Sequence, residues 1–327
     1  MKSLAIAGLA FASVIAGFSY LWQKLALDGL PPATVILGRV GIALACTAVL
    51  FVWKRRRLSW PFERRETGRI ALVGTIGFAV PLLLGIEGVK RSTAGNASIL
   101  ILLEPASILV FSRLLLGERI GRTRSIGVAA GIAGALVIVA ERAPVGDLLS
   151  ADYRTGNALL AVQAFLWGVF APLAHPLTRS HGPIEVVYGA MATSLLVLVP
   201  AALLESGDFS GGPALGRAIF WTVVLGVVVS FLTTLLWAFF LKHMTASATA
   251  PFAFLQPLAG VGAGAVVLGE RLSGGALLGG VVIGAGMLLV AGIPRPRRRL
   301  AAPPEGLAGL PAVAPESGDL RADGSKE

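Results

Sequence analysis

The sequence predicts an all-α integral membrane protein in which ten transmembrane helices form two inverted five-helix repeats. Three observations predict this fold class. The 327 residues are 55% hydrophobic and only 14% charged, whereas an ordinary soluble domain carries about 25% charged residues. Apolar stretches of membrane-spanning length recur along the chain, and the two halves of the chain match each other. The mean hydropathy of +0.79 argues against a soluble, disordered or coiled-coil protein.

Ten stretches are candidate spans, because a helix that crosses a bilayer needs about 20 mostly apolar residues. Turn-forming pairs such as Pro31-Pro32 and Gly182-Pro183 separate them. The stretches lack the alternation of a membrane barrel, and in lipid the backbone must satisfy its own hydrogen bonds, so each is expected to be a helix. In order, the expected spans are Leu4–Leu21, Ala33–Trp53, Ile70–Val89, Ala94–Leu115, Ser125–Ala140, Asn157–Ala174, Val186–Leu204, Ala218–Leu241, Ala246–Leu268 and Gly275–Ile293.

These spans divide the chain into four parts. Residues 1–141 form a first repeat, residues 142–156 an external linker, and residues 157–293 a second repeat. Residues 294–327 are rich in proline without periodicity and are expected to form a disordered cytoplasmic tail. The arginines that open this tail are typical of a stop-transfer charge cluster, which is favoured over a partner-binding segment.

The basic residues give the orientation. With the N-terminus in the cytoplasm, 20 of the 28 Lys and Arg residues fall in cytoplasmic segments and seven in external ones, while Arg39 lies within a span. Cytoplasmic loops of membrane proteins carry an excess of Lys and Arg, so both termini are expected inside. The net charge of +10 is therefore interpreted as a topology signal, and no nucleic-acid partner is predicted.

An internal repeat relates the two halves. At a constant offset of 152 residues, the tetrapeptides at 116–119 and 268–271 are both Leu-Gly-Glu-Arg. Each copy has five spans, an odd number, so the second copy is inverted in the membrane. Inverted repeats around a central site are the basis of alternating access, which favours a transporter. Further matches are Leu103-Glu104-Pro105 with Leu255-Gln256-Pro257, Gly127 and Gly134 with Gly279 and Gly286, and, at offset 151, Gly17 and Pro32 with Gly168 and Pro183.

The duplicated motifs resemble the EamA family of the drug/metabolite transporter superfamily. The similarity rests on a proline-containing fourth span, the Leu-Gly-Glu-Arg motif, a glycine-spaced fifth span, Trp167-Gly168, and Pro32 followed by Arg39. It covers about residues 4–293. Departures between the copies are Ala16 opposite Trp167 and Ala190 opposite Arg39. The resemblance implies a ten-helix inner-membrane carrier, often an exporter of amino acids, metabolites or drugs, that works without ATP.

Glu104 is the main candidate for chemistry. It lies near the middle of the fourth span, where a charged side chain costs about 2.5–3.5 kcal/mol on insertion, so it is expected to face a cavity or a partner. Pro105 removes a backbone donor and is expected to bend the helix there. Two roles remain open for Glu104: a proton-coupling or substrate-binding carboxylate, and a structural ion pair with Arg39. Two roles likewise remain open for Arg39: binding a substrate carboxylate and neutralising Glu104.

Helical spacing and the repeat extend the candidate site. Thr93 lies about three turns before Glu104 on the same helix face, and Ser107 lies nearby. Hydrogen bonding between helices is an equally good interpretation for such threonines and serines. The remaining candidates are Thr245, Phe252, Gln256 and the helix-bending Pro257 from the second copy, together with the aromatic Trp167.

No cofactor or metal is expected, and the chain is not expected to be an enzyme. One cysteine and three histidines offer little for a metal centre, and the sequence has no phosphate-binding loop and no His-Glu-x-x-His or Gly-x-Ser-x-Gly motif.

The expected function is secondary transport of small molecules, either proton-coupled or not. The alternatives are a passive facilitator and a membrane enzyme acting on lipid. The expected partners are a small-molecule substrate and the bilayer; the spacing of Gly127 and Gly131 fits packing within one bundle as well as a homodimer.

Overall fold

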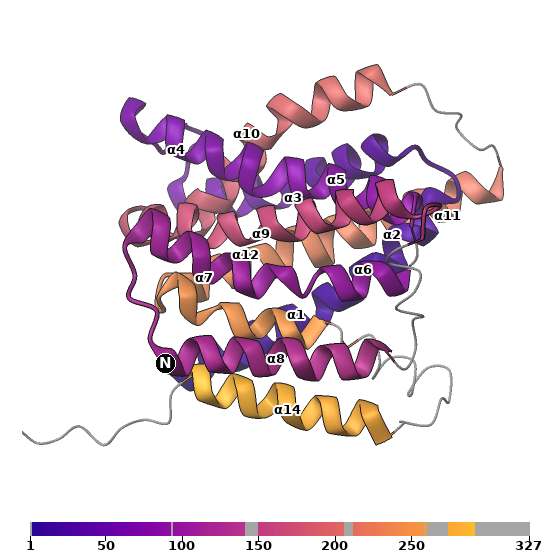
Figure 1. The fold of residues 1–327 in the computed structure, drawn as a ribbon. Coiled ribbons are helices and arrows are strands. Elements are labelled where there is room, and N and C mark those ends of the chain that lie inside the picture. Colours follow the sequence, from indigo (N-terminus) through magenta and orange to yellow (C-terminus); the bar gives the residue numbers. More distant parts are fainter. Residues whose placement is uncertain are drawn as a thin grey trace, which may run out of the picture. The chain divides into compact units, whose positions relative to one another are not determined.

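The computed structural model describes residues 2–92, 94–140, 150–205, 212–256, 258–259 and 274–291, and all regular structure in these ranges is helical. Residues up to Ala291 belong to one compact unit (Figure 1). Most of the expected linker and the whole expected tail lie outside the described residues. Among the described residues, five helical segments are long and apolar enough to cross a membrane: Pro32–Arg55, Arg64–Lys90, Arg154–Ser180, Pro183–Leu204 and Pro213–Leu241.

These five segments coincide with the second, third, sixth, seventh and eighth expected spans. The first half contains α1 (Lys2–Gly17), α2 (Ser19–Leu27), α3 (Pro32–Arg55), α4 (Arg64–Gly74), η1 (Thr75–Ala79), α5 (Val80–Lys90), α6 (Ala94–Leu100), α7 (Leu103–Leu116) and α8 (Arg122–Ala140). The second half contains α9 (Arg154–Ser180), α10 (Pro183–Leu204), α11 (Pro213–Val224), η3 (Leu225–Thr233), α12 (Thr234–Leu241), η4 (Ala246–Ala248), η5 (Ala250–Phe254) and α14 (Gly274–Ala291).

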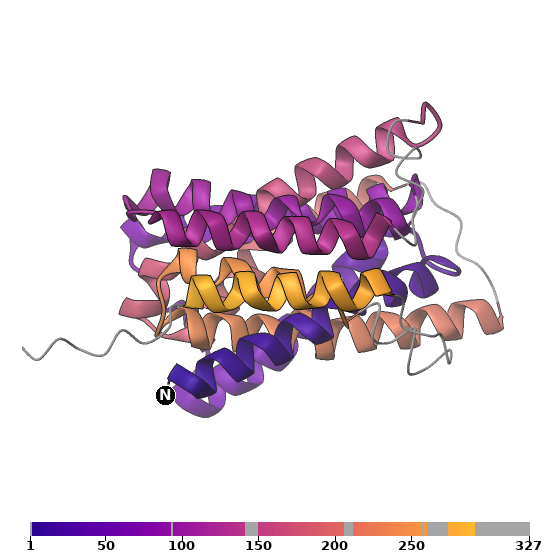
Figure 2. The ribbon, with the colours of Figure 1, turned by 60° about the horizontal axis from the view of Figure 1, so that its bottom comes forward.

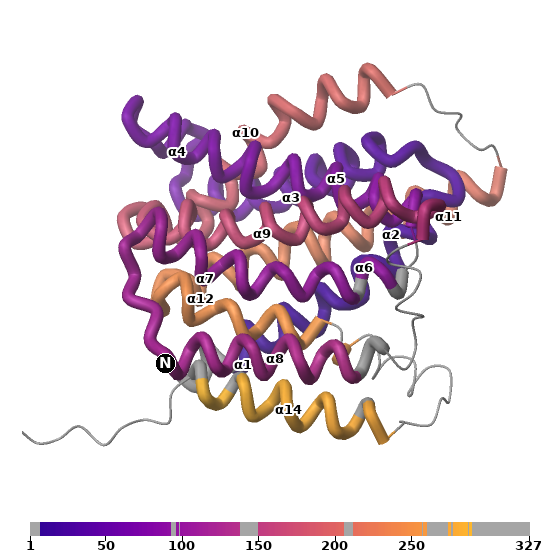
Figure 3. The backbone as a smooth tube through the Cα atoms, in the orientation of Figure 1, coloured from indigo at the N-terminus to yellow at the C-terminus, as the bar shows by residue number. Residues whose placement is uncertain are grey.

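Five expected spans are not single α-helices. Two of them contain a π-helical segment, and in the other three the prediction of one continuous helix per apolar stretch is wrong. The first breaks at Phe18 between α1 and α2, the fourth breaks between α6 and α7, and the ninth begins with the 3-10 turns η4 and η5 (Figure 3). Pro105 has no N–H for the carbonyl of Ile101, which instead accepts the N–H of Glu104 at 2.9 Å. The break therefore falls directly before Glu104.

The third span of each half contains a π-helical segment at an equivalent position. The segment η1 covers Thr75–Ala79, and the offset of 152 carries it to residues 227–231, inside η3. Such segments are rare and are frequent at functional sites. Because both copies have one, the π turn belongs to the repeated unit itself.

Glycines bring the backbones of the two halves into direct contact. The helices α8 and α14 run side by side in Figures 1 and 2. A Cβ on Gly134 would lie 2.7 Å from the carbonyl oxygen of Gly279, and a Cβ on Gly286 would lie 2.5 Å from that of Gly127. These are the four glycines that the repeat aligns, so the fifth spans pack reciprocally, as small residues allow.

Charged residues join α3 to α10 at both ends. Glu205, at the end of α10, accepts two backbone N–H groups in the first turn of α3 at 2.8 and 2.9 Å. Near the other end, the fully buried Glu185 of α10 accepts from Lys54 Nζ at 2.8 Å and from Arg55 Nη2 at 3.0 Å. The second spans of the two halves therefore form one antiparallel pair.

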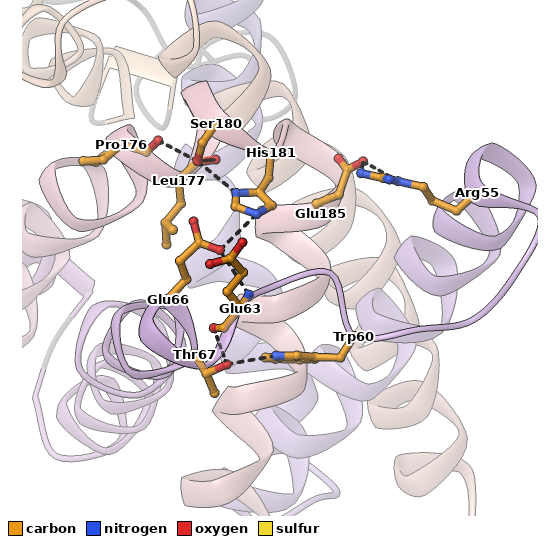
Figure 4. A network of polar contacts seen from close by, with 10 residues as sticks. All are labelled: Arg55, Trp60, Glu63, Glu66, Thr67, Pro176, Leu177, Ser180, His181 and Glu185. Atoms are coloured by element: carbon orange, nitrogen blue, oxygen red, sulfur yellow. Dashed lines mark hydrogen bonds and ion pairs between the residues drawn. The ribbon is translucent and has the colours of Figure 1, made fainter. Parts of the chain in front are cut away.

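A separate polar network lies near Glu185 at this end of the bundle (Figure 4). His181 Nε2 lies 3.1 Å from Glu66 Oε2, and Glu66 also accepts the N–H of Glu63 in the capping box that begins α4. Trp60 Nε1 donates to Thr67 Oγ1 at 3.1 Å. The contact between His181 and Glu66 thus joins the end of α9 to the first turn of α4.

The main hydrophobic core also draws on both halves, with side chains from α3, α5, α9, α10 and η3. Large apolar side chains are exposed as well, among them Leu204 at 84% and Val281 at 71%. Extended apolar surface of this kind marks a membrane-facing protein.

Candidate functional site

A cavity of about 140 Å³ lies between helices of the two halves. An engineered protein cavity of about 150 Å³ binds benzene, so this space admits a small organic molecule. Mostly apolar walls with a few polar groups are typical of small-molecule sites. The cavity is lined by Ala12, Ala16, Ser19, Tyr20, Gln23, Arg39, Phe78, Pro81, Leu82, Gly85, Ile101, Glu104, Ile108, Gln163, Trp167, Phe170, Ala171, Val229, Ser230, Thr233, Thr234, Trp237 and Gln256.

The lining follows the internal repeat. Most of these residues occur as pairs that the two sequence offsets align, so the same positions of both halves face one space. Secondary transporters commonly bind their substrates at the interface between internal repeats. The pairs are Ala12 with Gln163, Ala16 with Trp167, Ser19 with Phe170 and Tyr20 with Ala171 at offset 151, and Phe78 with Ser230, Pro81 with Thr233, Leu82 with Thr234, Gly85 with Trp237 and Glu104 with Gln256 at offset 152.

Glu104 and Gln256, the repeat-equivalent polar pair, meet at the cavity wall. Gln256 Nε2 donates to Glu104 Oε2 at 3.4 Å, and the Glu104 side chain is largely buried. Ser107 Oγ donates to the carbonyl of Glu104 at 2.9 Å, which supports the turn that carries the carboxylate. Within the described ranges, no ion pair joins Glu104 to Arg39.

Arg39 reaches the same cavity from α3. Its side chain is buried, and its Nε donates to Ser230 Oγ at 2.8 Å. Ser230 lies on the π segment η3, and the backbones are close there, because a Cβ on Gly226 would lie 2.9 Å from the Arg39 carbonyl oxygen. The π segment therefore both approaches and orients the arginine.

Aromatic side chains cover much of the remaining wall. Trp167 and Phe78 meet edge to face with centroids 5.8 Å apart, and Phe170 lies against Phe78 at 6.1 Å. Tyr20 and Gln163, from the two halves, also line this cavity. The cavity thus combines an aromatic wall with two separated charged groups.

The structure brings together four of the predicted site residues: Glu104, Gln256, Arg39 and Trp167 all line the cavity. The others lie elsewhere or are not described. Ser107 is buried beside Gly168 of α9, Phe252 packs with Leu9 and Phe240, and Thr245 is exposed at the N-terminus of η4. Thr93 and Pro257 lie outside the described residues.

Several lining residues were missed in the sequence. They are polar residues within an apolar span or just beyond its end: Tyr20, Gln23, Gln163, Ser230 and Thr233. Polarity within an apolar span could have identified these residues as lining a cavity. That signal is weak, because many polar residues in membrane helices hydrogen-bond to neighbouring helices instead. Applying the repeat to every polar position would have singled out Gln163, Ser230 and Thr233, which oppose apolar residues of the first copy.

No cluster of His, Cys, Asp or Glu that would hold a metal ion occurs in the described part of the chain. The single cysteine, Cys46, is free and lies on α3.

Membrane-length apolar helices, reciprocal packing of two halves and a cavity at their interface define the class: a helical membrane protein built from a duplicated unit. The chain belongs to the EamA-like transporter family, whose model matches residues 3–140 and 154–292 separately. This confirms the family resemblance seen in the duplicated motifs.

Curated relatives are similar over nearly their whole length. A "Probable terminal-alkyne amino-acid exporter" of Streptantibioticus cattleyicolor is 28% identical over 86% of this chain and 91% of its own. A "Probable amino-acid metabolite efflux pump" of Salmonella typhimurium is 25% identical over 84% of this chain and 91% of its own. A solved crystal structure at 19% identity covers 89% of this chain and 98% of its own with a TM-score of 0.68, which supports the fold.

Proposed function

We propose that this protein is a secondary transporter that exports small metabolites, amino acids or drugs by alternating access. The observation that carries the proposal is the cavity lined by repeat-equivalent residues of both halves. The family and its relatives named as exporters support the direction and the kind of substrate. A structural protein has no need for such a symmetric cavity.

The proposal places the chain in the inner membrane with ten spans and both termini in the cytoplasm. Two repeats, residues 1–141 and 157–293, each supply five spans of opposite orientation, joined by an external linker at 142–156. The distribution of Lys and Arg supports this orientation.

Within the cavity, Trp167, Arg39 and Gln256 contact the substrate, and Glu104 couples transport to protons. The support for coupling is that Glu104 faces the cavity, has a neutral amide as its neighbour, and is not paired with Arg39. Ser107 supports the turn that carries Glu104. Substrate contacts by Thr93, Thr245 and Phe252 stay predictions from the sequence, and Thr93 lies outside the described residues.

The test is transport by the purified protein in proteoliposomes. Vesicles are loaded with amino acids or with the cationic dye ethidium, and release is measured with and without a pH gradient, against vesicles without protein. Saturable release that the gradient accelerates supports the proposal. Non-saturable release that ignores the gradient would instead indicate a passive facilitator, and no release of any compound would refute transport.

Glu104→Gln tests the coupling role, because it keeps the shape, removes the charge and copies the residue of the second repeat. The variant is expected to fold and exchange substrate but to lose acceleration by the proton gradient. Thr47→Ala is the matched control, since this buried residue on α3 bonds its own helix and does not line the cavity. Gradient-driven transport by Glu104→Gln at the wild-type rate would contradict the coupling role.

A further inference from the structure

Arg39 has a binding capacity that its protein neighbours leave unused. Only 3% of the residue is exposed, its Nε donates to Ser230 Oγ at 2.8 Å, and Nη1 is fully buried without a hydrogen-bond partner among the described residues. Buried polar groups in proteins are nearly always paired, and a buried charge is costly unless it is paired. The exception points to a binding partner that enters from the cavity, because the Arg39 side chain lines that cavity.

The occupant is constrained by charge and shape. Glu104 lies on the same cavity but forms no ion pair with Arg39, and no other acidic side chain in the described part of the chain pairs with this guanidinium. A guanidinium is planar and binds a carboxylate through two parallel N–H groups. With Nε occupied by Ser230, the Nη edge is the part that remains for an anion.

The position is fixed before a ligand arrives. The Arg39 backbone lies against Gly226, and Ser230 holds its side chain one turn further along the same π segment. The second repeat has Ala190 at the equivalent place, so the cavity has one such arginine rather than a symmetric pair. A single anchor in a space of about 140 Å³ suits one small carboxylate group.

We propose that Arg39 binds the carboxylate of the transported molecule, so that this protein transports small carboxylates, amino acids among them, and rejects their uncharged carboxamides. Ser230 is a positioning residue that turns the guanidinium toward the cavity. This inference rests on the proposed transport function and adds the chemical class of the substrate.

The test compares acids with amides in wild-type proteoliposomes, which requires no substitution. Vesicles hold a mixture of the twenty amino acids, the corresponding amino-acid amides and ethidium, and release is followed by mass spectrometry. Vesicles without protein correct for passive leak. At least one amino acid is expected to leave about 100-fold or more faster than its amide, because a site built to pair a polar group rejects the analogue lacking it.

Variants assign the selectivity to Arg39. Arg39→Gln is expected to slow release of the acid about 100-fold, within the range of a hydrogen bond to a charged group, and so to bring the acid-to-amide ratio near one. Arg39→Lys keeps the positive charge but lacks the paired N–H groups of the guanidinium, so it is expected to retain part of the selectivity for acids. Ser230→Ala removes the hydrogen bond that orients Arg39 and is expected to weaken this selectivity. Thr47→Ala, on the same helix but away from the cavity, is expected to keep the wild-type ratio.

The outcomes separate this inference from the transport function. Wild-type release of amides at the rate of acids, release of ethidium alone, or unchanged acid selectivity in Arg39→Gln would each overturn the role of Arg39 while leaving transport intact. Release of no compound by the wild type would overturn both.

Discussion

Glu118, the acidic residue of the first Leu-Gly-Glu-Arg motif, is expected to stabilise the fold by capping a segment of the other half. The chain leaves α7 through Gly117, whose φ of +64° favours glycine. The Glu118 carboxylate accepts the backbone N–H of Ala246 at 3.0 Å and that of Ser247 at 3.2 Å, and it also accepts the Ser247 hydroxyl. Both residues at the start of η4 are fully buried.

Glu118→Ala removes the acceptor for these two buried N–H groups. Each unsatisfied group costs about 1–3 kcal/mol, and loss of a helix cap alone costs about 1 kcal/mol. Two groups in the lower half of the first range, at about 1–2 kcal/mol each, give an expected loss of about 2–4 kcal/mol. Glu118→Gln keeps one acceptor oxygen and is expected to lose about half of that. At about 2 °C per kcal/mol for a large domain, the alanine variant should melt about 4–8 °C lower.

The assay is thermal unfolding of the purified protein in detergent, followed by circular dichroism and by loss of monodispersity. Glu87→Ala is the matched control, because among the described residues the Glu87 side chain pairs with Arg91 alone, one turn away at 3.0 Å, and both side chains are partly exposed. Such pairs contribute about 0.3–0.5 kcal/mol. A melting temperature of Glu118→Ala equal to that of the Glu87→Ala control would refute the capping role.

Two further predictions concern packing and topology. A Cβ on Gly168 would lie 2.6 Å from the backbone nitrogen of Ile108, so Gly168→Val should push α9 from α7 and cost about 1–3 kcal/mol; unchanged thermal stability would contradict this close approach. Reporter fusions at Glu327 should report the cytoplasm and fusions within residues 205–217 the periplasm, and the opposite result at both places would invert the topology.

The sequence predicts the position of the spans well and their internal shape poorly. Boundaries such as those of α3 and α10 lie within three residues of their expected positions, because they depend on hydropathy, proline and charge, which are local. The π segments and the 3-10 turns depend on contacts between halves, such as the approach of Gly226 to Arg39. A single apolar stretch carries no signal for these contacts.

The candidate site shows the same limit. Glu104 and Arg39 are visible as charges in apolar spans, and Gln256 follows from the repeat. The prediction that Thr245 and Phe252 belong to the site assumed α-helical spacing. The chain there instead forms 3-10 turns, and Phe252 is buried against Leu9. Residue spacing predicts a shared face only where the helix type is known.

The central claim, alternating access to the cavity between the halves, is tested most directly by a cysteine in its wall. The chain has one natural cysteine, so Cys46→Ala provides a background on which Ala171→Cys, a small change at a lining position, is the only thiol. A membrane-impermeant thiol reagent is applied to either side of oriented vesicles. The account predicts labelling from both sides and protection by a transported amino acid on each. Labelling that no transported compound reduces would place the pathway elsewhere and contradict the account.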